Sequence, residues 1–312
     1  MNVPPSRPAF SQKPANLTDP PRMVPSSVRL RVLFGGWAQI AWLILGFTMS
    51  FVWAFDVPSS LREWSAFRGS LEAVSGAVTS VEKTNVTVGG GKGRSGTPVY
   101  RYNYEFQVGG ETFQGQSYNT GQSGRVSSAP RPGVTIEFPL GDPSRSRIQG
   151  MRSSMMGIGA LFVGLFPLAA VVALGVAFWV GQRNIHLLQD GLLTSAKLVF
   201  KSVIHGRTSK GRQTTSYKLT FEFHDMQGTS RMFSVTVSNP KYIEDEEQEP
   251  VLYDPHDPTR PAVLMDMLPG RPRVAPDGTL QSTSPQWDLL VLLLPAAVIL
   301  GHGWFFVTHV LG

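Results

Sequence analysis

Three long uncharged stretches divide the chain. They span residues 32–55, 153–181 and 289–311, and none of them contains Asp, Glu, Lys or Arg. A helix needs about 20 apolar residues to cross the roughly 30 Å of hydrocarbon in a bilayer. Each stretch is long enough to cross once, and the middle one is too short to cross twice. The sequence therefore predicts three transmembrane helices.

The two polar segments between these stretches alternate apolar and polar side chains. The recurring apolar residues are Tyr100, Tyr102, Tyr104 and Phe106 in the first segment and Tyr217, Leu219, Phe221 and Phe223 in the second. Such alternation is typical of a half-buried antiparallel strand. A short turn containing glycine follows each run and leads into a further stretch, at 111–118 and at 229–237. Each segment is therefore predicted to contain a hairpin.

The two polar segments also match each other in order, as in an internal repeat. Residues 74–88 align with 193–204, and residues 134–148 align with 250–264. Each segment predicts about five short strands, and a sheet this small must curl or close to protect its edges. The predicted fold is an α+β membrane protein. It has three transmembrane helices and, in the two loops between them, two small antiparallel β modules, each a five-stranded barrel-like or curled sheet.

These patterns give the domain boundaries. Residues 1–31 form a Pro- and Ser-rich tail with too little apolar surface to fold, so it is expected to be disordered. The other segments are transmembrane helix 1 (32–55), an amphipathic linker helix (56–71), β module 1 (72–150), transmembrane helix 2 (153–181), β module 2 (182–268), a linker (269–286) and transmembrane helix 3 (289–311). Leu61, Trp64 and Phe67 recur at helical spacing in the linker helix, which either lies in the membrane interface or packs on β module 1.

Composition narrows the chemistry. Charged residues make up 16% of the chain, below the roughly 25% of a soluble domain, which favours a membrane protein. Cysteine is absent, which excludes disulfides, thiol nucleophiles and thiolate metal sites. The net charge of +6 is not concentrated on one face, so no nucleic-acid partner is expected.

The basic residues suggest an orientation. Arginines precede the first and third apolar stretches at Arg22, Arg29, Arg31, Arg271 and Arg273. Because Lys and Arg are enriched in cytoplasmic loops, we expect a multi-pass protein of the cell (inner or plasma) membrane. The N-terminus and residues 182–286 would be cytoplasmic, and residues 56–152 extracytoplasmic. The arginines around the second stretch favour the opposite orientation.

The most site-like stretch is the turn at residues 253–258. Asp254, His256 and Asp257 are residue types that ligate divalent metals. Asp and Pro also build tight turns by themselves, and the matching turn at 138–143 lacks counterparts of Asp254 and His256. A structural turn is therefore the favoured interpretation.

Other motifs fall short of known catalytic patterns. The glycine-rich stretch 89–96 lacks the Lys-Ser or Lys-Thr pair and the following helix of a phosphate-binding loop. The stretch 121–124 is not a nucleophile elbow, and the acidic cluster at 244–249 is typical of a solvated loop. The sequence therefore predicts no catalytic, cofactor-binding or metal-binding residue, no cofactor, and a protein that is not an enzyme.

Polar and small residues inside the apolar stretches predict helix contacts. His302 is expected to hydrogen-bond a neighbouring helix or to reach the membrane interface, rather than to move a proton or bind a metal. Small residues recur at spacings of three or four and favour close helix packing; they include Gly157, Ala160, Ala169, Ala173, Ala297 and Gly301. The expected partners are the lipid bilayer and, through this packing, either another protein or a second copy of the chain.

The second polar segment resembles a known family. The residues that carry the resemblance are Tyr217, Phe221, Phe223, Tyr253, Asp254, Pro255, Asp257 and Pro258, between membrane helices. The pattern resembles a bacterial membrane-protein family of unknown function, whose members generally carry one small β domain between two transmembrane helices. The first segment departs from it, with Pro139-Leu140 in place of the first Asp-Pro. The resemblance implies a membrane-bound β domain and supplies no activity.

Two functions agree with these predictions. The first is a non-enzymatic membrane protein that displays two related β modules for binding, scaffolding or envelope maintenance. The alternative is an accessory subunit whose β modules dock a membrane enzyme or transporter.

Overall fold

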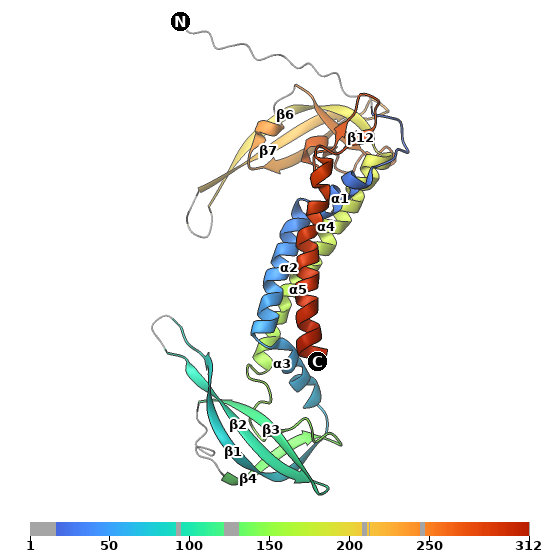
Figure 1. Ribbon diagram of the computed structural model, residues 1–312. Helices are drawn as coiled ribbons and strands as arrows, with labels where there is room; N and C mark the ends of the chain where they lie inside the picture. Colours follow the sequence, from blue (N-terminus) through green and yellow to red (C-terminus); the bar gives the residue numbers. More distant parts are fainter. Residues whose placement is uncertain are drawn as a thin grey trace. The chain divides into compact units, whose positions relative to one another are not determined.

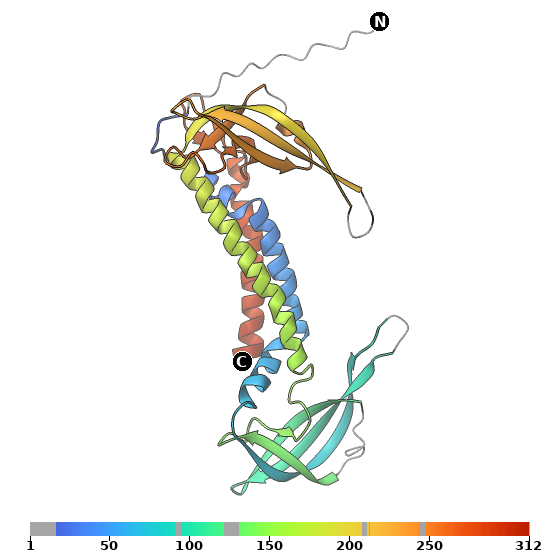
Figure 2. The ribbon, with the colours of Figure 1, turned by 180° about the vertical axis from the view of Figure 1, so that it is seen from behind.

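The computed structural model describes residues 17–91, 95–121, 131–207, 211, 213–243 and 247–311. The chain divides into two compact units. The module 2 unit combines the residues up to Leu43 with Val172–Ile299, and the module 1 unit combines Ile44–Val171 with the residues from Leu300 onward. Each unit contains one β module and part of every long helix (Figures 1 and 2).

Three helices are long and apolar enough to cross a membrane, as the sequence predicted. Their most apolar stretches are only 11% to 17% buried, so most of their side chains have no protein cover. Apolar surface of this extent indicates a membrane protein. The candidate membrane-spanning segments, called crossings below, are α2 (Trp37–Ala54), η1 (Ile158–Gly164) with α4 (Leu165–Asp190), and η4 (Pro285–Leu292) with α5 (Leu293–Phe306) and η5 (Val307–Leu311).

The first apolar stretch is divided between two helices. α1 (Ser26–Phe34) ends before Gly35, and α2 begins at Trp37. Gly36 has a φ of +54°, a left-handed conformation that favours glycine. A Cβ on Gly35 would lie 2.4 Å from the Arg31 carbonyl oxygen. The glycine pair therefore turns the chain, and the prediction of one helix from residue 32 to residue 55 is wrong at its start.

β module 1 is a five-stranded antiparallel sheet. Its strands are β1 (Leu71–Val88), β2 (Thr97–Val108), β3 (Glu111–Thr120), β4 (Arg131–Pro139) and β5 (Arg147–Ile148), in the order β3-β2-β1-β4-β5. The predicted inward side chains Tyr102, Tyr104 and Phe106 are buried in one core with Phe138. The alternation along β2 is therefore the pattern of a strand with one covered face.

The sheet of module 1 curls into a half-barrel (Figure 2). Its two edges meet at a single backbone pair, because Tyr118 of β3 exchanges hydrogen bonds with Arg152, which follows β5. The Ser117 hydroxyl also accepts a hydrogen bond from the Ile148 amide of β5 at 2.8 Å. These contacts satisfy part of an edge strand that would otherwise be open to pairing with another chain.

β module 2 has the same strand order as module 1. Its strands are β6 (Leu192–Arg207), β7 (Gln213–His224), β8 (Ser230–Val237), β9 (Glu249–Tyr253) and β10 (Val263–Leu264), in the order β10-β9-β6-β7-β8. Thus β6 takes the central place of β1, and β7 takes the place of β2. Leu219, Phe221 and Phe223 are buried in the core, on the face that the alternation predicted.

The second half of the predicted tail is folded. It belongs to a buried cluster of Val24, Val28, Val32, Ile185, Leu187, Leu188, Leu252, Met265, Leu268 and Leu280. Arg22 adds to this packing, because its guanidinium donates to the Leu188 carbonyl at 3.0 Å. Disorder is therefore wrong for residues 17–31, and residues 1–16 lie outside the described residues.

The segment predicted as a plain linker, residues 269–286, also contributes to this cluster. It contains the hairpin of β11 (Arg273–Val274) and β12 (Leu280–Gln281), and Leu280 is one of the buried residues. The tail, the end of α4 and this hairpin share one apolar core, so the linker prediction is wrong.

The predicted linker helix is α3 (Val57–Ala66), which ends earlier than expected because the chain enters β1 at Leu71. Leu61 and Trp64 are exposed, whereas Glu63 is buried. The helix contacts the rest of its unit through Glu63, and it leaves its most apolar side chains uncovered.

The small residues meet the prediction of close packing only in part. Gly157 and Ala160 are buried at the start of the second apolar stretch. Ala169, Ala173, Ala297 and Gly301 are exposed within this chain, and a Cβ on Gly301 would meet nothing within 4 Å. Spacing alone does not fix the rotation of a helix about its axis, so the predicted packing face is wrong for these four residues within the chain.

Candidate functional site

A buried carboxylate connects α3 to the start of the second membrane crossing. Glu63 is 8% exposed. Its Oε1 accepts a hydrogen bond from the Ser153 amide at 3.0 Å. Its Oε2 accepts bonds from the Ser154 amide at 3.0 Å and from the Ser154 hydroxyl at 2.5 Å. These three bonds fix the path of the chain as it leaves module 1 and approaches the membrane.

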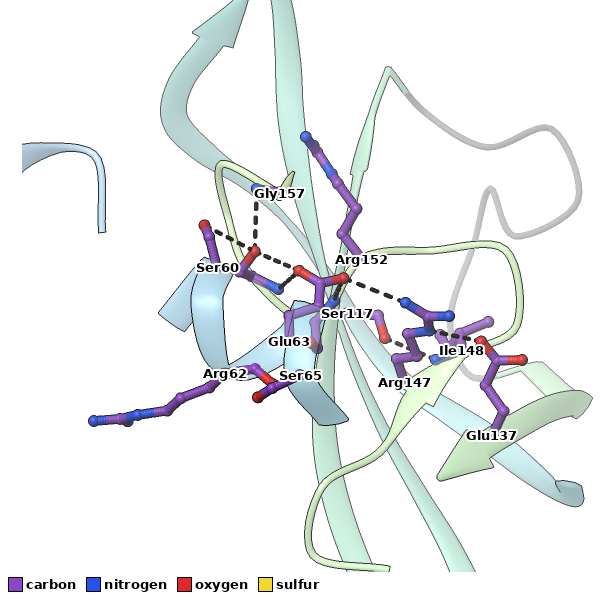
Figure 3. Close-up of polar contacts among 12 residues, drawn as sticks. Ser60, Arg62, Glu63, Ser65, Ser117, Glu137, Arg147, Ile148, Arg152 and Gly157 are labelled. Carbon is purple, nitrogen blue, oxygen red and sulfur yellow. Dashed lines mark hydrogen bonds and ion pairs between the residues drawn. The ribbon is translucent and has the colours of Figure 1, made fainter. Parts of the chain in front are cut away.

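Arg147 on β5 supplies a positive charge beside this carboxylate (Figure 3). One guanidinium nitrogen, Nη1, lies 3.5 Å from Glu63 Oε1, and Nε donates to Glu137 Oε1 of β4 at 2.6 Å. The guanidinium also lies over the ring of Phe67, 4.1 Å from its centroid. The planar fork of arginine suits such shared contacts. One side chain thus joins the α3 end to two strands. We call Glu63, Arg147, Ser153 and Ser154 the Glu63 clamp.

The Ser154 hydroxyl extends the clamp. It accepts a hydrogen bond from the Gly157 amide at 3.1 Å and lies 3.4 Å from the Ser60 hydroxyl of α3. Gly157 has a φ of +67°, and a Cβ there would lie 2.6 Å from the Arg152 side chain. The turn that precedes η1 therefore requires glycine.

The geometry of the Glu63 clamp fits a structural role rather than a catalytic one. Both Glu63 oxygens accept hydrogen bonds from backbone amides, and the Ser154 hydroxyl donates its hydrogen bond to Glu63. A serine nucleophile needs access to a substrate and a base that can receive its proton. Ser154 is only 3% exposed, so the arrangement as it stands is suited to holding α3 in place.

A second ionic contact fastens the N-terminal segment in the module 2 unit. Arg31 of α1 donates from Nε to Asp288 Oδ1 of η4 at 2.5 Å. The Ser282 hydroxyl donates to the same oxygen at 3.0 Å. Asp288 is 2% exposed. We call these three residues the Arg31 clamp, which joins the segments that lead into the first and third membrane crossings.

The turn at residues 253–258 caps itself, as the favoured interpretation expected. Asp254 Oδ1 accepts a hydrogen bond from the His256 amide at 2.9 Å. Asp257 accepts a bond from Arg260 Nε at 2.9 Å and one from the Thr259 hydroxyl. The Thr259 bond, opposed by partial desolvation and aided by Arg260, holds the pKa of Asp257 below its usual value.

This turn borders a cavity of about 500 Å³ at the end of α4. His186 and His256, which are dispersed in the sequence, line the same cavity together with Arg183 and Arg260. Arg183 is held by a hydrogen bond to the Pro261 carbonyl at 2.8 Å. Among the residues that the structure describes, no group of three His, Asp or Glu side chains has the geometry of a metal site.

His302 makes the predicted contact between helices. Trp53 Nε1 of α2 donates to His302 Nδ1 of α5 at 2.9 Å, and His302 Nε2 lies 3.0 Å from the Gly46 carbonyl oxygen. A neutral imidazole has one donor and one acceptor nitrogen. Since Nδ1 accepts from Trp53, Nε2 is the donor to Gly46, and both nitrogens are used between α2 and α5.

The members of the Glu63 clamp are not predicted by the sequence. Glu63 lies among the charged residues of the predicted amphipathic helix, and Ser153 and Ser154 lie at the start of the second apolar stretch. The only available signal was weak: two serines stand at the polar end of an apolar run. Hydroxyl residues favour helix starts, but nothing in the sequence joins them to Glu63.

Comparisons of the chain with protein-family models, with curated proteins and with solved structures found no match. The resemblance to a bacterial membrane-protein family therefore stays a prediction.

Proposed function

We propose that the chain is a non-enzymatic integral protein of the cell membrane, which holds two related β modules in fixed orientations on its membrane helices. Its role would be binding, scaffolding or envelope maintenance. The observation that supports this proposal is that each of the two units contains an ionic clamp with a buried carboxylate. Glu63 and Arg147 secure α3 to module 1, and Arg31 and Asp288 secure α1 within the module 2 unit. A chain that merely tethered its domains would need only flexible linkers.

The packing of the tail supports the proposed orientation. Residues 17–34 share a core with the end of α4 and with residues 252–280, so both parts must fold on the same side of the membrane. The arginines before the first and third crossings favour the cytoplasm for that side. Because the α4 segment crosses once, residues 56–152 would then be extracytoplasmic.

Reporter fusions test this orientation. A reporter that is active only in the cytoplasm should be active when it is inserted at Ser209 and inactive when it is inserted at Gly91. A reporter that is active only outside the cytoplasm should give the opposite result. A third fusion, at Thr18 in the folded tail, should report the same side as Ser209. The same sidedness for Gly91 and Ser209 would contradict a single crossing by α4.

Purification in mild detergent tests the binding role against the alternative of an accessory subunit. If the β modules dock a membrane enzyme or transporter, a catalytic partner should co-purify in fixed stoichiometry with the full chain. We expect no such partner, and its recovery would overturn the proposal in favour of the accessory role. A variant lacking the ionised Glu63 (Glu63→Gln) should keep any partner of module 2 and weaken contacts that depend on the orientation of module 1.

The equal strand order of the two sheets supports a duplicated helix–β–helix unit. In this proposal the second crossing closes the first unit and opens the second, and the family that the second segment resembles would correspond to one such unit. The two modules would then differ in what their surfaces bind rather than in how they fold.

A further inference from the structure

The two modules extend the same hairpin arm from the sheet but cover it with different residues. In module 1 the arm is the part of β1 and β2 that begins at the bulge at Thr79. In module 2 it is the part of β6 and β7 that begins at the bulge at Val199. Both arms contain a β-bulge at the same place: one residue, Thr79, is extra between Val78 and Ser80, and Val199 is extra between Leu198 and Phe200. The pairing of Lys83 with Tyr100 corresponds to that of Val203 with Tyr217. The two registers therefore align from the bulge to this pair. Beyond it, β1 and β2 have a second irregularity between Lys83 and Thr87, whereas β6 and β7 pair regularly to Arg207.

Three aligned positions are polar in module 1 and apolar in module 2. Module 1 has Thr79, Ser80 and Lys83 where module 2 has Val199, Phe200 and Val203, whereas Val81 aligns with Lys201. Ile204 follows Val203 on β6, and all four apolar residues of module 2 are exposed, Phe200 to 61%. We call Val199, Phe200, Val203 and Ile204 the apolar arm patch. Because module 1 builds the same bulge with polar residues at three of these positions, the bulged hairpin does not require apolar residues there.

The patch lies on both faces of the ribbon. In an antiparallel pair, opposite residues point to the same side, so Val203 lies on the face of Tyr217, and Phe200 and Ile204 lie on the face of Thr220 and Ser216. Because β8 pairs with β7 at Thr220 and Tyr217, Phe200 and Val203 lie on the edge strand of a three-stranded part of the sheet, and Ile204 begins the two-stranded part. Exposed apolar residues on both faces of such an edge are an association hazard in water. A surface that can surround the arm would remove this hazard better than a flat protein face.

The charge of the arm identifies that surface. Lys201, Arg207 and Lys218 lie on the arm, and no Asp or Glu occurs from Leu198 to Phe221. The arm of module 1 has an acid, Glu82, which lies 3.6 Å from Arg101. Apolar side chains among Lys and Arg, with no acid, are the combination that binds the interface of an anionic bilayer. In such binding, the aliphatic and aromatic side chains insert at the boundary between the headgroups and the acyl chains, and the Lys and Arg side chains contact the lipid phosphates.

We propose that the β6–β7 arm is a membrane anchor that inserts Phe200, Val203 and Ile204 into the headgroup region of an anionic bilayer. The arm slopes from the sheet back along the direction of the helices of its own unit (Figures 1 and 2). Those helices already hold the unit at the membrane, so the arm binds at a high effective concentration of lipid. The proposal depends on the proposed membrane location and not on the binding role of the modules.

The absence of cysteine allows a direct test with one label. The full chain carrying His205→Cys is labelled with an environment-sensitive fluorophore and reconstituted in nanodiscs of phosphatidylcholine with phosphatidylglycerol, which also contain a headgroup spin-labelled lipid. The control is Asn85→Cys, which lies two residues beyond Lys83 on the arm of module 1, as His205 lies two residues beyond Val203 on the arm of module 2. We expect strong quenching at residue 205, little at residue 85, and a several-fold weaker effect at 205 in discs of phosphatidylcholine alone.

A swap variant makes the test specific to the patch. The variant combines Phe200→Ser, Val203→Lys and Ile204→Thr. The first two introduce the residues that module 1 has at the aligned positions, and the third introduces the residue that follows Lys83, so the hairpin should still form. We expect this variant to lower the quenching at residue 205 to the level seen at residue 85. Equal quenching at 205 and 85, or no effect of the swap, would overturn the proposal.

Two further outcomes separate the alternatives. If the signal at residue 205 appears only in discs that hold two chains, the patch joins two copies and the lipid proposal is wrong. If the full chain does not enter discs at all, the proposed membrane location fails together with the anchor. Failure of the anchor alone would leave the chain in the disc with an unquenched label.

Discussion

Replacing Glu63 with alanine will separate α3 from the start of the second membrane crossing. The substitution leaves the amides of Ser153 and Ser154 without their acceptor and removes one of the two carboxylates beside Arg147. Arg147 keeps Glu137 as its partner, so the cost comes mainly from the two amides. Each buried donor left without an acceptor costs about 1–3 kcal/mol. The remaining donors have already lost their contact with water, and this desolvation is part of the cost.

Hydrogen exchange of the full chain in detergent measures this effect. Peptides that cover residues 150–158 should lose protection by a factor on the order of a hundred or more, because the local opening free energy falls by the energy of the lost contacts. Peptides from β7 should not change. The matched control is Glu105→Ala, since Glu105 is an exposed carboxylate on β2 of the same module. Equal exchange in the two variants would show that Glu63 does not hold this segment.

Much of the fold follows from local patterns in the sequence. The aromatic residues of β2 and β7 alternate strictly, so the buried face of each strand was predictable from period alone. The three apolar stretches were equally clear, because a bilayer imposes a length that a soluble core does not. The strand count and the hairpins followed from the same alternation and from the glycines between the runs.

The contacts that fasten the modules could not be predicted in this way. Glu63 and Ser154 are 91 positions apart, and the helical pattern of α3 gives Glu63 the appearance of a solvent-facing charge. The tail was expected to be disordered for a related reason. Val24 and Val28 are too few to form a core alone, and they are buried only because Leu188 and Leu252 lie beside them. Composition describes a segment, whereas burial depends on its distant partners.

The pairing of residues across the arms shows a further limit of sequence reasoning. A plain alignment of the two loops places Tyr100 with Tyr217, but it does not reveal that β1 and β6 share a bulge. Once the bulge is known, Ser80 and Phe200 occupy equivalent sites. The difference between the modules then becomes a difference of surface chemistry on a common backbone, which is where distinct binding functions are expected.

Replacing Arg31 with methionine will destabilise the module 2 unit. Asp288 is 2% exposed and would keep only the Ser282 hydroxyl as a partner. Methionine retains an apolar stem of similar reach, so the lost packing is small, whereas the uncompensated buried charge costs about 3–5 kcal/mol. We expect a clear fall in the unfolding midpoint of the full chain in detergent. The control is Arg29→Met, an exposed arginine on the same helix.

A double variant separates the charge of the Arg31 clamp from its position. Replacing a buried ion pair with apolar residues of similar size is often neutral or stabilising, so Arg31→Met with Asp288→Leu should recover most of the lost stability. If the double variant is as unstable as the single one, the specific hydrogen bond between α1 and η4 is required, and apolar contact cannot replace it. If Arg31→Met behaves like Arg29→Met, the clamp does not hold the unit together. Recovery would show that the cost lies in the stranded carboxylate. The apolar cluster formed by the tail, the end of α4 and the β11–β12 hairpin would then be sufficient to hold α1 and η4 together.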